Sequence, residues 1–132
     1  MDQGRALREL REVIKTEAAL PGATFGDVLD QLADQWGEVS LAVGGKATAD
    51  PTEIGAASVD YLMYSGYVML AYLWARMDRV ANDDPADDYS SGKHKTARFY
   101  FDRILPRAEG HRRALMAGAA SLMSPGPAEI AH

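Results

Sequence analysis

Proline-containing breaks divide the chain into four segments of helical length, and this division constrains the fold more than any other feature. The breaks are Pro21-Gly22, Asp50-Pro51, residues 82–88 and Pro125-Gly126-Pro127. Proline cannot continue the hydrogen-bond ladder of a helix, so each break is a helix boundary. Between the breaks there is no Asn-Gly or Asp-Gly hairpin signal and no clean period-two alternation. The sequence therefore predicts an all-α fold.

Each segment carries apolar residues at the three- and four-residue spacing that places them on one helix face. The four stripes are Leu7, Leu10, Ile14 and Ala18; Leu29, Leu32, Trp36, Val39 and Val43; Ala57, Tyr61, Tyr64, Val68, Ala71 and Ala75; and Ala97, Phe101, Ile104, Ala108, His111 and Leu115. Four amphipathic helices with short connections predict an antiparallel four-helix bundle over residues 1–123. Residues 124–132 are broken by proline and glycine and are predicted to form a flexible tail.

Local signals add detail to three of the helices. The hydroxyl of Thr24 is expected to cap the second helix, and Asp50 is expected to cap the third, with Pro51 at its first position. Pro106 lies inside the fourth segment, where its ring clashes with the carbonyl of Asp102, so we expect a kink there. These signals make the fourth helix a proline-kinked one.

The third segment is apolar nearly all round. Besides its stripe it carries Leu62, Met63, Met69, Leu70, Leu73 and Trp74. A helix of this kind is buried on more than one side or lies at a protein interface. We therefore expect it to be the central helix.

Length and charge exclude several classes of protein. The chain has 132 residues, a net charge of −5 and no cysteine. This length fits one core, and the acidic balance argues against binding nucleic acid or an anionic membrane. The charged N-terminus shows no secretory signal, and the uncharged stretch 61–75 is too short to span a bilayer. The sequence predicts a cytoplasmic domain.

No residue pattern supports chemistry within the chain itself. The histidines, at positions 94, 111 and 132, do not occur in a His-Glu-x-x-His or Glu-x-x-His motif. The acidic run 83–88 lacks the ligand spacing of a calcium loop. We therefore predict no catalytic, cofactor-binding or metal-binding residues. His111 falls on an apolar stripe and is expected to be a hydrogen-bonded core or interface histidine.

Two features allow either a core role or an interface role. One is a set of aromatic residues on the third helix, and the other is a charged flank on the fourth. Tyrosine and tryptophan are common where an apolar face meets a partner, although most such residues lie in cores. The possible interface residues are Tyr61, Tyr64, Tyr67, Trp74, Lys95, Arg98 and Tyr100.

The same two helices resemble a known family. Residues 57–68, followed by Ala75-Arg76, resemble its Ala-x-x-Tyr-Leu-x-x-x-Gly helix, and residues 95–100, followed by residues 104–107, resemble its next motif. Both are similar to the extra C-terminal helical domain of long bacterial acyl-CoA dehydrogenases, the group that includes methylthiopropanoyl-CoA dehydrogenase. The order of segments, from the Trp36 helix to the Ala117-Gly118-Ala119 ending, extends the resemblance over residues 5–123.

The resemblance implies a function for a larger enzyme. Such enzymes are flavoproteins of fatty-acid metabolism, in which a glutamate removes the α-proton of an acyl-CoA thioester and FAD accepts the β-hydride. The FAD site and that glutamate lie in domains upstream of the region resembled here. We therefore expect an accessory domain that packs on the catalytic body or on identical subunits, inactive alone, in a homo-oligomer. The alternative is a free-standing binding or dimerisation module without catalytic activity.

Overall fold

A computed structural model describes residues 2–49, 51–82 and 88–122. Its helices are α1 (Asp2–Ala18), α2 (Gly26–Ala49), α3 (Pro51–Ala81), α4 (Asp88–Phe99) and α5 (Ala108–Leu122). No strand occurs within these residues, which confirms the all-α prediction. The expected cap at Asp50, the acidic run at 83–87 and the tail at 124–132 lie outside the described residues.

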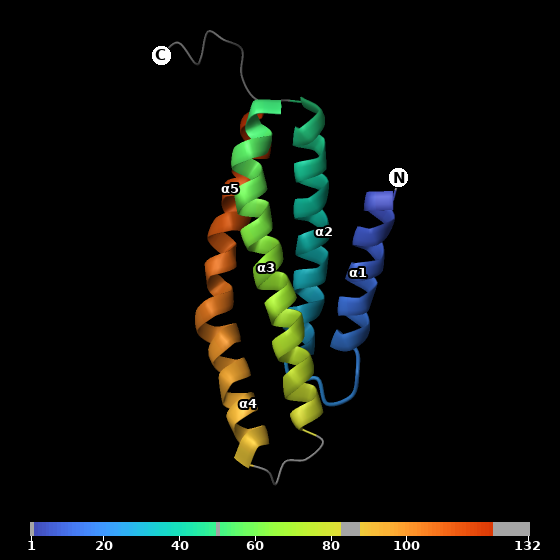
Figure 1. The fold of residues 1–132 in the computed structure, drawn as a ribbon, viewed down its shortest axis with the longest axis vertical. Coiled ribbons are helices and arrows are strands. Elements are labelled where there is room, and N and C mark those ends of the chain that lie inside the picture. The colour runs from blue at the N-terminus through green and yellow to red at the C-terminus, as the bar shows by residue number, and fades with distance from the viewer. Residues whose placement is uncertain (1, 50, 83–87, 123–132) are drawn as a thin grey trace.

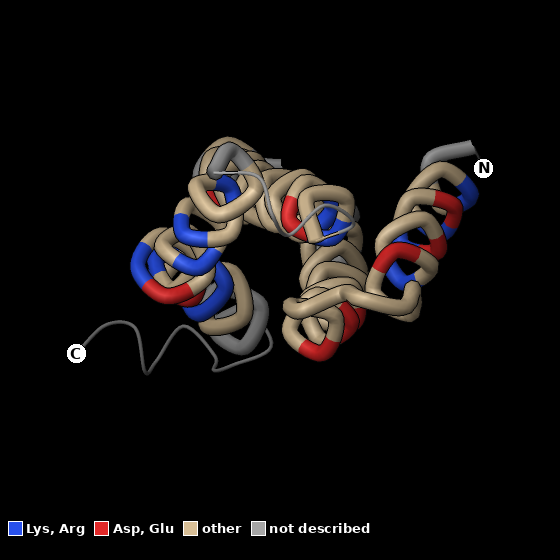
Figure 2. The backbone as a smooth tube through the Cα atoms, turned by 90° about the horizontal axis from the view of Figure 1, so that it is seen from below, with Lys and Arg blue, Asp and Glu red and all other residues tan. Residues whose placement is uncertain are grey.

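The helices lie side by side, with α3 in the middle of the arrangement. Figure 1 shows α2, α3 and the α4–α5 stretch next to one another, with α1 beside α2 at the edge. Figure 2, seen along the long axis, shows the same order. α3 packs against α2, α4 and α5, and more narrowly against α1. It is the helix with the widest set of neighbours, as its composition indicated.

The core consists largely of the predicted stripes. Trp36 anchors the α2 stripe, and its indole nitrogen donates a hydrogen bond to Ser65 Oγ on α3 at 3.1 Å. On α3 the buried face includes Ala71 and Ala75, whose small side chains let neighbouring helices approach. The buried apolar residues are Ile14, Phe25, Leu29, Leu32, Ala33, Trp36, Val39, Ala57, Tyr64, Val68, Ala71, Ala75, Ala97, Tyr100, Phe101, Leu105, Ala108 and Leu115. The four sequence stripes therefore identify most of the core.

The start of α2 differs from the expectation. The helix begins at Gly26, with the backbone nitrogen of Leu29 donating to the carbonyl of Phe25. Thr24 does not begin it: its Oγ1 instead accepts a hydrogen bond from the side chain of Asn82 at 3.3 Å. Gly26 lies against the carbonyl of Ala18, where a Cβ would collide with the backbone. The close packing of the end of α1 on the start of α2 thus sets this boundary.

The fourth helical stretch changes its hydrogen-bond pattern around Pro106. A π-helical turn occupies Tyr100–Ile104, and a 3₁₀ turn containing Pro106 occupies Leu105–Arg107. The Leu105 nitrogen donates to the Tyr100 carbonyl, five residues back. Proline has no N–H to donate and its ring obstructs the carbonyl four residues earlier, so α-helical pairing is interrupted. The sequence located this interruption but not its π-helical form.

Among the described residues, no helix combines the length and the hydrophobicity that crossing a bilayer requires.

Leu29 and Leu41 provide a matched test of the core on a single helix. Leu29 is fully buried, whereas Leu41 is 80% exposed. Leu29→Ala should lower the free energy of unfolding by about 2–5 kcal/mol, because it leaves a cavity. Leu41→Ala should change it by less than about 0.5 kcal/mol. Urea denaturation followed by circular dichroism measures both, and equal losses would contradict this account of the core.

Candidate interaction surface on α3

The outer face of α3 carries a continuous apolar stripe. Leu62 is 72% exposed, Val59 is 63% exposed, and Leu70 and Leu73 are each 46% exposed. We call the following residues the outer stripe: Val59, Leu62, Gly66, Leu70, Leu73, Met77 and Val80. They recur every three or four residues, and each lies about half a turn of helix from the buried face. The stripe therefore faces away from the core along most of α3.

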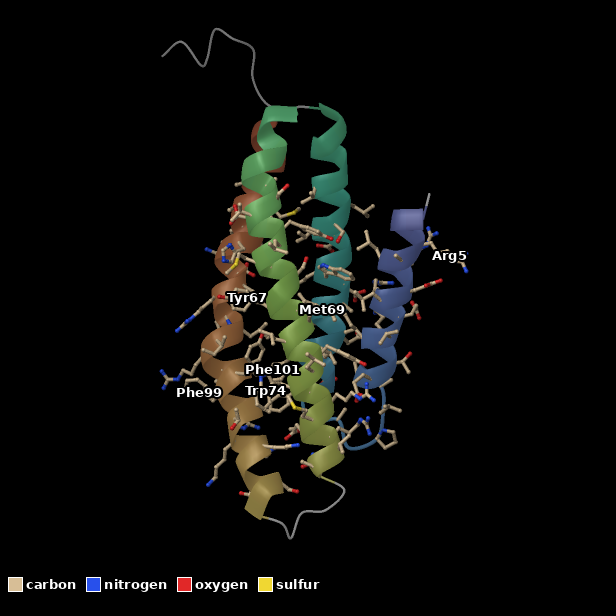
Figure 3. The ribbon with its side chains drawn as sticks, viewed as in Figure 1. Arg5, Tyr67, Met69, Trp74, Phe99 and Phe101 are labelled. Carbon is tan, nitrogen blue, oxygen red and sulfur yellow. The ribbon has the colours of Figure 1, made fainter. Side chains whose placement is uncertain are left out.

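The surroundings of the outer stripe are also largely apolar. Exposed Met63 lies beside it, and partly buried Trp74 and Met69 lie on its two flanks. Figure 3 shows Met69 on the side of α2 and Trp74 on the side of α4. The stripe itself contains no charged residue. Contiguous apolar surface of this kind on a folded domain marks a site of interaction with another molecule.

A shallow pocket lies at the C-terminal end of the outer stripe. It has a volume of about 300 Å³ and is lined by Leu73, Arg76, Met77, Val80 and Lys93. The floor comes from α3, and Lys93 comes from the middle of α4. The pocket thus combines an apolar floor with two cationic side chains.

The seven possible interface residues separate into three groups. Tyr64 and Tyr100 are buried in the core, so their side chains face other helices of this chain and not a partner. Tyr61, Tyr67 and Trp74 are partly buried, and Lys95 and Arg98 are exposed. These seven residues do not form one surface, because they lie on both the inner and the outer sides of the fold.

Hydrogen bonds explain the positions of the tyrosines. The Tyr100 hydroxyl donates to the carbonyl of Tyr67 at 2.5 Å, which joins the π-helical turn to α3. The hydroxyls of Tyr61 and Ser40 are 2.6 Å apart and join α3 to α2. Arg98 lies over the ring of Phe25, 5.6 Å from its centre, in a cation–π contact. The polar ends of these side chains are engaged within the domain.

The outer stripe itself is only partly visible in the sequence. Leu62, Leu70 and Leu73 of the stripe, and Met63 beside it, are among the residues that make the helix apolar all round. What the sequence does not show is which apolar side of α3 the other helices cover. Periodicity alone gives two opposite stripes on this helix, and the packing of α2, α4 and α5 selects one of them.

Two histidine–aspartate pairs connect α3 to the helices that follow it. His94 Nδ1 lies 2.6 Å from Asp78 Oδ1, and His111 Nδ1 lies 2.8 Å from Asp60 Oδ1. His111 is therefore hydrogen-bonded, as expected, but both aspartates were missed. The sequence does hold a signal for these pairs. Two aspartates stand on a largely apolar helix, and they are nearly as far apart along the chain as the two histidines.

The Asp78 pair is unusual in its burial. The Asp78 side chain is fully buried, and its Oδ2 has no hydrogen-bond partner among the described residues. His94 is partly exposed and stacks near Phe25. A third polar contact, between Arg79 and Glu17, joins α3 to α1 through two hydrogen bonds of 2.5 and 3.1 Å. These contacts position helices and do not converge on one site.

Across residues 2–49, 51–82 and 88–122, no three His, Asp or Glu side chains are grouped as metal ligands. Burial raises the pKa of Tyr64 to about 12 and also raises that of Tyr100. Both tyrosines are core residues. The outer stripe is thus the feature that most resembles a functional site.

The two buried tyrosines predict a loss of stability in alkali. In the unfolded chain tyrosine ionises near pH 10, whereas folded Tyr64 keeps its proton up to about pH 12. The unfolded state therefore binds fewer protons in this range, and stability should fall as the pH rises from about 10 towards 12. Urea midpoints at about pH 9 and about pH 11 measure the fall. A variant with Tyr64→Phe and Tyr100→Phe should lose less stability between these two pH values. If the variant loses as much stability as the original chain, the two tyrosines are not the cause of the fall.

The Asp78–His94 pair is tested by a double-mutant cycle. His94→Ala leaves a buried carboxylate without its partner and should cost about 1–3 kcal/mol of unfolding free energy. In an Asp78→Asn background the same substitution should cost less, because no buried charge remains. Thermal or urea unfolding of the four proteins gives the coupling. Strictly additive losses would show that the two side chains do not stabilise each other.

Comparison with known protein families gives a match over most of the chain. The sequence model of the family described as "Acetyl-CoA dehydrogenase C-terminal like" matches residues 6–125. Neither the curated proteins nor the solved structures gave a significant match.

Proposed function

Because the chain belongs to the acetyl-CoA dehydrogenase C-terminal-like family, we propose that it is the accessory helical domain of an FAD-dependent acyl-CoA dehydrogenase. The observation that carries the proposal is the family match, which covers nearly the whole chain. The complete enzyme would introduce the α,β double bond into an acyl-CoA thioester. The complete enzyme would be one of the long bacterial acyl-CoA dehydrogenases related to methylthiopropanoyl-CoA dehydrogenase, and it would act in fatty-acid metabolism in the cytoplasm. The sequence motifs support its membership of this group.

The described residues do not fit FAD. A dinucleotide requires donors that face its pyrophosphate, commonly at a glycine-rich helix start. A surface hollow of about 560 Å³ is open and is lined by Ala18, Ala19, Gly26, Asp27, Asp30 and Gln31. Its two carboxylates would repel phosphate groups. The flavin chemistry is therefore assigned to the catalytic body and not to this chain.

The contribution of this domain to the enzyme is assembly. We propose an antiparallel four-helix bundle with a bend at Pro106, whose outer stripe is covered by another polypeptide surface in the complete enzyme. Exposed Leu62, Leu70 and Leu73 support this, because covering them removes apolar area from water. The same surface also suits a free-standing dimerisation module. An acyl-CoA dehydrogenase core encoded with this chain distinguishes the accessory domain from that alternative.

The purified chain should be colourless and should not reduce an artificial electron acceptor with acyl-CoA as donor. The reason is that the reaction needs bound flavin and a base beside the α-carbon, which the catalytic body supplies. Flavin absorbance and acceptor reduction are the measurements. A yellow, active preparation would overturn the proposal.

Removing this domain from a complete enzyme should lower the yield of soluble, assembled protein. The flavin content of each molecule that does assemble should change much less, because the FAD site lies elsewhere. Size-exclusion chromatography with flavin quantification separates the two effects. Unchanged assembly after deletion would contradict an accessory role.

A further inference from the structure

We infer that the outer side of the α4–α5 stretch binds an acidic segment of another polypeptide, which lies along it in an extended conformation. We call this surface the basic face and define it by Lys95, Arg98, Phe99, Arg103 and Arg107. The outer stripe of α3 contributes none of these residues. The inference thus goes beyond the proposed function, and it does not depend on a dehydrogenase core.

The sequence concentrates positive charge in this stretch. Residues 88–122 contain seven Lys and Arg against three Asp and Glu, a net charge of +4 in a chain whose total is −5, so all other residues together carry −9. Figure 2 shows the blue segments of Lys and Arg gathered along α4 and α5, at the left of the view. A local charge opposite in sign to that of the whole chain attracts acidic groups to one side of the molecule.

Helix geometry places the residues of the basic face on one side. Lys95, Phe99, Arg103 and Arg107 recur every four residues, and all four are exposed. Such a row drifts round a regular α-helix, because one turn contains about 3.6 residues. The π-helical turn Tyr100–Ile104 begins directly after Phe99 and pairs residues five apart, so it contains one residue more than an α-helical turn. This turn reverses the drift and keeps the row on one side of the stretch.

The cations of the basic face are not neutralised within the domain. None of the four forms an ion pair with a carboxylate among the described side chains. Arg98 instead lies over the ring of Phe25. Asp102 is exposed in the same stretch and offsets one of the four charges, which leaves a net +3. On α1, by contrast, three cations pair with acids of α1 and α2. The charge of the basic face is thus left for an external partner.

An exposed aromatic ring lies within the basic face. Phe99 is 58% exposed, and Figure 3 shows it on the side of α4 that faces away from α3. It lies four residues after Lys95 and four before Arg103. Aromatic residues and arginine are enriched in protein interfaces, where the ring supplies apolar contact. The basic face therefore offers one apolar contact among charged ones, which suits a polypeptide partner.

The spacing of the basic face selects an extended acidic segment. Lys95 and Arg107 are about 18 Å apart along the helix axis, so the four positions of the row follow one another at about 6 Å. Alternate residues of an extended chain are about 6.6 Å apart, and their side chains point to the same side. A partner segment with acidic residues and one apolar residue at alternate positions can therefore meet every position of the row. Recognition of acidic motifs by arginine clusters is a recurrent mode of peptide binding.

The charge of the rest of the chain favours a short acidic segment over nucleic acid. A phosphate backbone carries charge along its whole length, and its affinity comes mainly from the phosphates that a protein neutralises. Residues outside 88–122 carry −9 and repel such a long polyanion. A short acidic segment contacts only the basic face and avoids this repulsion.

Fluorescence anisotropy with labelled peptides tests the inference. The peptides Glu-Thr-Leu-Thr-Glu-Thr-Glu and Glu-Thr-Glu-Thr-Leu-Thr-Glu place leucine opposite Phe99 in one or the other chain direction. At least one should bind saturably, and raising the salt from about 50 mM to about 500 mM should weaken its binding, because exposed charges are screened. The matched peptides with glutamine in place of glutamate should not bind.

Variants of equal charge locate the binding surface. Arg103→Gln with Arg107→Gln should weaken peptide binding at least about fivefold, because two charge contacts are lost. Arg5→Gln with Arg8→Gln removes the same charge from exposed positions on α1 and should weaken it less than about twofold. Phe99→Ala should also weaken binding. Circular dichroism establishes that each variant keeps its helices.

Four outcomes overturn the inference. If neither acidic peptide binds saturably, the basic face does not recognise acidic segments. Equal losses in the two double variants would show attraction to the overall charge and not to this face. Tighter binding of a short single-stranded oligonucleotide would assign the face to nucleic acid. Sedimentation showing a dimer that Arg103→Gln with Arg107→Gln abolishes would assign it to a second copy. The colour, activity and deletion experiments are separate, so the accessory role and the basic face fail independently.

Discussion

The structure depends on the burial of one face of α3. On that face the side chains of Tyr64, Val68 and Ala71 are each 1% exposed or less, and three other helices pack around the face. The alanines allow close approach, and the tyrosine fills the space between helices. One helix supplies the shared wall of the core, and no helix of the described residues packs on its opposite face. The apolar core and the exposed outer stripe are thus two consequences of the same arrangement.

Polar contacts fix how the other helices align with α3. Hydrophobic burial is non-directional, so it does not by itself set the register of one helix against the next. Asp60 and Asp78 supply that direction through His111 and His94, and Arg79 does so for α1 through Glu17. The buried carboxylate of Asp78 costs free energy if its partner is lost, which penalises shifted alignments. A few hydrogen-bonded polar pairs therefore fix the alignment of the helices in this small domain.

Pro106 shows how a local defect becomes part of the packing. The π-helical turn before it widens the helix, and within that turn Tyr100 and Phe101 are both buried. Tyr100 then donates to a carbonyl of α3, and Phe101 stacks on Phe25, with ring centres 4.2 Å apart. An interruption that weakens an isolated helix is compensated here by contacts with Phe25, which directly precedes α2, and with α3. Such compensation depends on the segments that pack against the π-helical turn, and the presence of a proline does not by itself predict it.

The sequence by itself determined the helical class, the four segments and most of the core. It did so because breaks and three-to-four spacing are local properties of a chain. The family resemblance was equally accessible, since it rests on residues in order. Only the tertiary structure decided that Tyr64 and Tyr100 point inward, that Thr24 bonds to Asn82, and that Asp78 is buried. It also decided which apolar side of α3 stays exposed. A helix with two opposite apolar stripes has no local reason to bury one of them, and the choice is made by the neighbours that pack against it.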